Sequence, residues 1–219
     1  MLDKLKSQKK ETLINSFLFI FFGVGIIGLG TPASRELFKG LMPFSLLLGM
    51  GLMFIAHDRW EVKQVLVLLV VAITGFGIEV AGVLTGDVFG QYSYGDSLGI
   101  KVWGTPPMIG LNWMMLIYCV YYMMQQTRLP AWGQSIAGSA LMVVYDIIME
   151  PVAIRLDMWS WGGGDIPLQN YIAWFVISLL LLALMHLTRM RYKNGVAAVL
   201  FFVQMIFFLI LNIVKYYQS

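Results

Sequence analysis

Long apolar stretches recur along this sequence, and they limit the folds that the chain can adopt. Seven of them are each close to the roughly 20 residues that an α-helix needs to cross a lipid bilayer. They cover residues 12–29, 40–56, 64–86, 107–124, 135–156, 168–187 and 197–214. Backbone groups in lipid must find their hydrogen bonds within the protein, so we expect an all-α membrane protein with about seven transmembrane helices in one bundle.

The composition agrees with this expectation. Hydrophobic residues make up 59% of the 219 residues and charged residues only 12%, a balance that a water-soluble domain of this size does not show. We therefore expect a single transmembrane helical domain over residues 1–219. The only cysteine, Cys119, lies within the fourth apolar stretch and excludes an internal disulfide.

The positive charges predict an orientation in the membrane. With a cytoplasmic N-terminus, ten of the 15 Lys and Arg residues fall on the cytoplasmic side. The other five are Arg35, Lys39, Lys101, Arg155 and Lys215. The net charge of +3 therefore reflects topology, and no nucleic-acid partner is indicated. The first stretch exceeds a signal-peptide core in length and lacks an A-x-A-like site, so we interpret it as a retained span.

Two carboxylates interrupt the fifth apolar stretch. Asp146 and Glu150 are four residues apart and therefore share one face of the predicted helix. A charged side chain at bilayer depth is costly, so such acids are candidates for a functional site. Pro151 follows directly. It cannot donate a backbone hydrogen bond and its ring crowds the carbonyl of Ile147, so we expect the helix to kink or end near Glu150.

A third carboxylate, Glu79, lies in the third stretch. Gly75, Gly82 and Gly86 recur on its side of the helix and predict a groove that another element can approach closely. A purely structural, hydrogen-bonded carboxylate is the alternative interpretation. No basic residue shares the depth of the three acids, so we expect at least one to be protonated beside an ionised one, the arrangement that general acid and base catalysis needs.

The segments after the two acid-bearing helices share one order: acid, aromatic pair, proline, then asparagine with tryptophan. The residues are Glu79, Tyr92, Tyr94, Pro107, Asn112 and Trp113 in one half, and Glu150, Trp159, Trp161, Pro167, Asn170 and Trp174 in the other. This weak repeat, with unequal spacing, predicts two related helix pairs that face one pocket in the outer half of the membrane. For each aromatic residue, a place in the interfacial belt is the alternative.

Other membrane chemistries fit the sequence less well. The last stretch contains no lysine for a retinal Schiff base. His57 and His186 fall near the predicted cytoplasmic ends, away from the acids, so no metal site is predicted. The spacing of Asp146 and Glu150 suits a magnesium ion with a prenyl diphosphate, but no basic cluster accompanies it. The sequence also lacks a phosphate-binding loop or dinucleotide fingerprint in the required context.

The motifs resemble those of the CruF-type carotenoid hydratase family. They are E-x-A-G-x-x-x-G-x-x-F-G-x-Y-x-Y from Glu79, P-x-x-x-x-N-W from Pro107, D-x-x-x-E-P from Asp146, and W-x-W followed by I-P-L-Q-N-Y-x-x-W. The resemblance covers residues 75–174. It implies an enzyme that adds water to the terminal double bond of an acyclic (psi) carotenoid end group, as in lycopene or a monocyclic carotene. The product is a tertiary 1'-hydroxy carotenoid, and no cofactor is needed.

The resemblance also implies a set of site residues. Glu79, Asp146 and Glu150 are the expected catalytic acids and bases, and which of them donates the proton stays open. The expected substrate-binding residues are Tyr92, Tyr94, Asn112, Trp113, Trp159, Trp161, Asn170 and Trp174, with no metal. The segment GGGDIPLQN departs from the family pattern, which puts the shape of that loop in question.

The expected partners are the carotenoid, water, membrane lipid and other carotenoid enzymes, at the inner (plasma) membrane of a bacterium. Two alternatives use the same buried acids. One is a proton-coupled membrane carrier, in which the acids relay protons during transport. The other is a different carotenoid end-group enzyme, such as a cyclase.

Overall fold

The computed structural model describes residues 2–214, with side chains from residue 8 onward. Its seven long helices are α1 (Leu2–Gly30), α3 (Met42–Ala56), α4 (Val62–Thr85), α5 (Met108–Gln125), α6 (Ala131–Arg155), α7 (Leu168–Leu187) and α8 (Gly195–Ile213). The shorter elements are α2 (Arg35–Gly40), β1 (Tyr92–Tyr94), the 3-10 turn η1 (Asp96–Leu98) and β2 (Trp159–Trp161). The all-α prediction is confirmed, and every predicted stretch overlaps one long helix.

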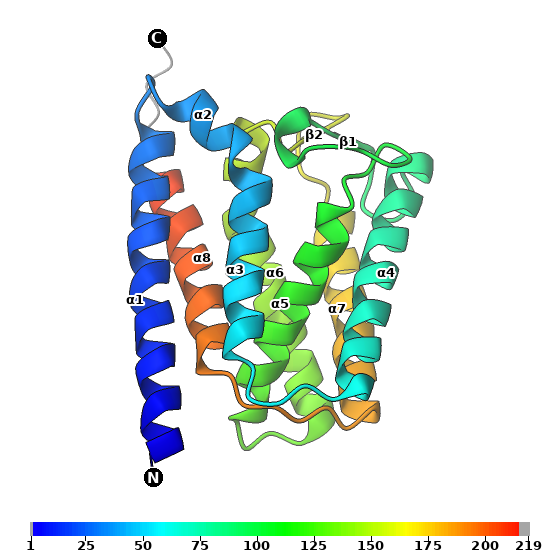
Figure 1. The fold of residues 1–219 in the computed structure, drawn as a ribbon. Helices are drawn as coiled ribbons and strands as arrows, with labels where there is room; N and C mark the ends of the chain where they lie inside the picture. The colour runs from blue at the N-terminus through cyan, green and yellow to red at the C-terminus, as the bar shows by residue number, and fades with distance from the viewer. Residues whose placement is uncertain (1, 215–219) are drawn as a thin grey trace.

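Helix length and composition identify a multi-pass membrane protein. Five helices, α1, α4, α6, α7 and α8, are long and apolar enough to cross a bilayer. Helix α3 is also apolar, but its 15 residues make it shorter than these five helices. Successive long helices run in opposite directions, so α1 begins at one end of the bundle and α8 finishes at the other (Figure 1). The cytoplasmic N-terminus stays a prediction, and the side chains of Lys4, Lys6 and Lys215, which entered its charge count, lie outside the described residues.

Helix α5 forms the centre of the bundle (Figure 1). It packs against α3, α4, α6, α7 and α8. Residues 113–121 are all buried, so nine consecutive side chains on every side of the helix contact protein. A helix that is buried all round belongs to a core rather than to a lipid-facing surface. This position lets α5 supply residues to cavities inside the bundle.

The segments that follow α4 and α6 pair with each other above the bundle. β1 and β2 form a two-stranded antiparallel sheet in which Tyr92 lies opposite Trp161 and Tyr94 opposite Trp159. Side chains alternate along a strand, so all four rings share one face and the central serines share the other. The shared order of residues predicted that both segments face one pocket, but it did not predict this sheet. The sheet covers one end of the bundle (Figure 1).

Helix α6 continues through Pro151, so of the two outcomes expected near Glu150, a kink or an end, the end is wrong and the kink stays a prediction. The helix runs on to Arg155. Proline opens the preceding turn of a helix and frees carbonyl groups there, and neighbouring helices can satisfy them. Here the Asn212 side-chain amide of α8 donates to the Ile148 carbonyl at 2.7 Å. This contact joins α8 to the turn of α6 that precedes the proline, and no local sequence signal predicts it.

Candidate active site

Ten of the eleven candidate residues line one cavity beneath the sheet, which we call the acid pocket. They are Glu79, Tyr92, Tyr94, Asn112, Trp113, Glu150, Trp159, Trp161, Asn170 and Trp174. Phe89, Ile109 and Met149 complete the lining, and the sequence carried no signal for these three. The volume of about 30 Å³ exceeds the roughly 10–15 Å³ that a cavity needs, on the same measure, to hold one water molecule. The predicted shared pocket therefore exists, and it is small.

Three hydrogen-bond donors converge on Glu79 of α4. The Trp113 indole Nε1 donates to Oε1 at 2.8 Å. The hydroxyl groups of Tyr92 and Tyr94 donate to Oε2 at 2.6 and 2.7 Å. Glu79 is only 5% exposed, so these donors replace the water that the carboxyl group loses on burial. Both strand β1 and helix α5 are thereby tied to one side chain of α4.

Two glycines of α4 make room for these donors. A Cβ atom at position 75 would lie 2.6 Å from the Trp113 Cβ atom, and one at position 82 would lie 3.0 Å from the Tyr92 hydroxyl oxygen. The predicted close approach at Gly75 and Gly82 is confirmed, and side chains rather than backbone approach. Gly86 has a different role, because it ends α4 with a φ of 73°, a conformation that favours glycine.

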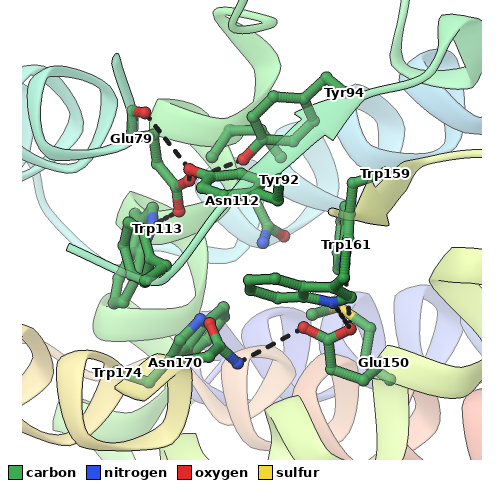
Figure 2. A pocket seen from close by; sticks show the side chains of 13 residues that line it. Glu79, Tyr92, Tyr94, Asn112, Trp113, Glu150, Trp159, Trp161, Asn170 and Trp174 are labelled. Atoms are coloured by element: carbon green, nitrogen blue, oxygen red, sulfur yellow. Dashed lines mark hydrogen bonds between the residues drawn. The ribbon is translucent and has the colours of Figure 1, made fainter. Parts of the chain in front are cut away.

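Glu150 of α6 occupies the other side of the acid pocket (Figure 2). The indole Nε1 atoms of Trp159 and Trp161 donate to its Oε2 at 3.0 and 3.2 Å. An indole N–H can only donate, so Oε2 acts as the acceptor in both contacts. The other oxygen, Oε1, has only a long contact of 3.4 Å with the Asn170 side-chain amide. Of the two oxygens, Oε1 is therefore the one with fewer and longer hydrogen bonds.

Asp146 lies behind the wall of the acid pocket and does not line it. It is fully buried, and Asn170 Nδ2 donates to its Oδ2 at 2.7 Å. Because the same amide also faces Glu150, Asn170 connects the two acids that the sequence paired. The Asp146 Oδ1 atom has no hydrogen-bond partner within the described part of the chain. This geometry supports a positioning role for Asp146, acting on Asn170.

Aromatic rings enclose the acid pocket. The ring centroids of Trp113 and Trp174 are 4.5 Å apart, and those of Tyr92 and Trp161 are 5.3 Å apart. Burial, reinforced by the charge of the nearby Glu79, raises the pKa of Tyr92 and Tyr94, so both remain phenols that can donate. The faces of such rings attract a cation. The pocket therefore combines two acids with walls suited to a positive charge.

Charges around the acid pocket are few. The ion pairs found among the described side chains join Lys39 to Glu36 and Lys101 to Asp96, and neither includes an acid of the site. The described residues also contain no group of three or more His, Cys, Asp or Glu side chains that would hold a metal ion. The chemistry that this arrangement supports is transfer of protons between carboxyl groups.

Comparisons with known proteins place the chain in a family. A family model described as carotenoid biosynthesis protein matches residues 41–218, a range that contains the whole acid pocket. Bisanhydrobacterioruberin hydratase of Haloarcula japonica is 25% identical over 122 residues, which are 51% of this chain and 41% of the relative. The matched region is thus less than half of that relative's length. No solved structure matches the chain. The extent of the family match shows that this chain belongs to the carotenoid biosynthesis protein family, as the resemblance to carotenoid hydratases implied.

Proposed function

We propose that this protein adds water to the terminal double bond of an acyclic (psi) carotenoid end group, as in lycopene or a monocyclic carotene. The product is a tertiary 1'-hydroxy carotenoid. One observation carries the proposal: Glu79 and Glu150 lie on opposite sides of a small pocket with aromatic walls (Figure 2). A relative that is named a hydratase supports the same class of reaction.

Glu150 is the proton donor in this proposal. Its Oε2 accepts from two indole groups, and we assign the proton that is delivered to the alkene to Oε1, which has only one long contact. Glu79 is the base, since three donors hold its carboxylate in place beside the water site. Hydrogen bonds from such donors favour the charged form of a carboxyl group.

The addition uses two proton transfers, and a third returns the enzyme to its starting state. The alkene π bond takes the Oε1 proton of Glu150 at its less substituted carbon, which leaves a tertiary carbocation at the other carbon. The water oxygen then bonds to that carbocation while one water proton passes to Glu79. The proton returns to Glu150 through water in the pocket, so the sum is alkene plus water giving alcohol. The addition involves no net oxidation or reduction, and the scheme therefore uses no redox cofactor.

The remaining residues of the site have supporting roles. The rings of Trp113, Trp161 and Trp174 present faces that stabilise the carbocation. Asn170 holds Glu150 Oε1 toward the pocket, and Asp146 positions the Asn170 amide. General acid and base catalysis of this kind contributes roughly a hundredfold to ten-thousandfold to the rate.

The test is expression in a bacterium that accumulates lycopene, and in one that accumulates a monocyclic carotene, followed by mass analysis of the pigments. We expect a new pigment that is heavier by one water and carries oxygen from isotopically labelled water. A Glu150→Gln variant should lose this product. Asp157→Asn, which also replaces an acid by its amide but at an exposed position, should keep it.

Three outcomes would refute the proposal. If no pigment gained the mass of water in either strain, the hydratase assignment would be wrong, and a carrier that moves its substrate unchanged would account for that result. A pigment of unchanged mass but altered retention would indicate a cyclase. Label from molecular oxygen in the product would indicate a hydroxylase.

A further inference from the structure

A second, larger cavity adjoins the acid pocket. It has a volume of about 260 Å³ and lies between the last turns of α1, the first half of α3, and α8. We call it the apolar cavity. Four residues, Ile109, Asn112, Met149 and Trp159, line both this cavity and the acid pocket. The two spaces are therefore neighbours that share one wall.

The lining of the apolar cavity suits a hydrocarbon. Its side chains are mainly Phe, Leu and Met, and none of the described lining residues is charged. The polar groups Tyr145 and Gln204 contact each other, with the Tyr145 hydroxyl 3.4 Å from Gln204 Oε1. Rings of Phe22 and Phe207, whose centroids are 5.5 Å apart, contribute aromatic surface to the wall. An apolar ligand with π electrons finds complementary contacts here.

The rim of the apolar cavity faces sideways, where lipid surrounds a membrane protein. Val24 of α1 is 51% exposed, and Phe44 of α3 is 65% exposed. Both line the cavity, together with the exposed Leu41, which directly precedes α3, and Leu48 of α3. A molecule dissolved in the hydrocarbon layer reaches such an opening without crossing water. An apolar substrate can thus enter from the membrane toward the acids.

We propose that the apolar cavity binds the polyene chain of the carotenoid substrate, while the end group reaches the acids through the shared wall at Asn112 and Trp159. The inference rests on the proposed function for the identity of the ligand. The acid pocket, at about 30 Å³, is far smaller than the apolar cavity at about 260 Å³, so the long chain needs a second site that adjoins it. The apolar cavity is smaller than a carotenoid, so the rest of the chain lies between α1 and α3 in the lipid.

The experiment fills the cavity from α3. Ser45 lines the apolar cavity, whereas Leu47, two residues away, does not. We expect Ser45→Phe to weaken lycopene binding by about tenfold or more and to lower turnover, because the new ring occupies the space of the chain. Leu47→Phe should change both by less than about twofold. Binding is measured by titrating purified protein in nanodiscs with lycopene and following the quenching of tryptophan fluorescence.

A second measurement applies if Ser45→Phe does not fold. Cys119 is buried at 1% exposure, so a thiol introduced by Ser45→Cys is the one that reacts with a maleimide. We expect lycopene to slow alkylation at position 45, and not that of a Leu47→Cys variant. Equal alkylation rates with and without lycopene would overturn the proposal. Full protection by phospholipid alone would also overturn it, since the cavity would then hold an acyl chain.

The failure of this inference and that of the proposed function are distinguishable. If Ser45→Phe bound and hydrated lycopene like the wild type, the polyene site would be wrong while the hydratase assignment stood. If Ser45→Phe blocked binding but the wild type never produced a heavier pigment, the cavity would bind the carotenoid and the proposed reaction would be wrong.

Discussion

Replacing Gly75 by alanine tests how the acid pocket is assembled. The new Cβ atom would lie 2.6 Å from Trp113 Cβ and 2.9 Å from Trp113 Cγ, distances at which something must move. These atoms sit at the root of a side chain that is 1% exposed and packs against Trp174, so a simple rotation cannot relieve the clash. Helices α4 and α5 must separate, or Trp113 must leave Glu79.

The two consequences have different magnitudes. Overpacking a well-packed core costs about 1–3 kcal/mol. If the Trp113 N–H also leaves the Glu79 carboxyl group, a lost hydrogen bond to a charged group adds about 1.5–3 kcal/mol. We therefore expect a loss in the free energy of unfolding of about 1–6 kcal/mol. Turnover should fall about tenfold for each 1.4 kcal/mol of stabilisation that the transition state loses.

Gly77 provides the matched control on the same helix. An added Cβ atom there meets nothing within 4 Å, and the residue is exposed. Alanine favours a helix over glycine by up to about 1 kcal/mol, so Gly77→Ala should be neutral or stabilising. The assay compares unfolding of both variants in mixed micelles with increasing dodecyl sulfate, with lycopene turnover measured in parallel. If Gly75→Ala matched Gly77→Ala in both readouts, the close approach of Trp113 to α4 would be wrong.

Three further predictions concern the acids and the loop after β1. Glu150→Gln should lower turnover by about a hundredfold to ten-thousandfold with nearly unchanged unfolding, because the amide oxygen still accepts from the indoles; full activity would exclude Glu150 as the acid. Tyr94→Phe removes one donor to Glu79 and should cost about tenfold to a hundredfold in turnover, which kinetics against Ser93→Ala, a change on the outer face of the sheet, will check. The hydrogen bond and charge of Lys101 lower the pKa of Asp96 from 3.8, so their contribution to stability is present above that pH and is lost as the pH falls through the lowered value. Unfolding measured over this range should show a weaker pH dependence in Asp96→Asn, and an unchanged profile would contradict the role of the pair.

The long helices and the acids follow from local sequence. Apolar stretches of span length can satisfy their backbone groups in lipid as helices, so the positions of all seven long helices could be predicted without tertiary information. Burial of a carboxyl group among apolar residues is costly wherever the chain goes, which made Glu79, Asp146 and Glu150 visible as candidates. The shared order of residues after α4 and α6 also predicted that both segments contribute to one pocket.

The partners of those acids depend on contacts between distant segments. Pairing of β1 with β2 joins residues 67 apart in sequence at Ser93 and Ser160, and it aims the Tyr and Trp donors at two different acids. The Asn212 amide of α8 contacts the turn of α6 that precedes Pro151, and the Asn170 amide of α7 joins Asp146 to Glu150.

The apolar cavity arises from how α1, α3 and α8 pack and has no motif of its own. The sequence by itself thus determined the long helices, the residues that share one face of a helix, and the candidate acids. Only the packing between helices decided which donors reach each acid and where a hydrocarbon can lie, because those contacts join residues far apart in the chain.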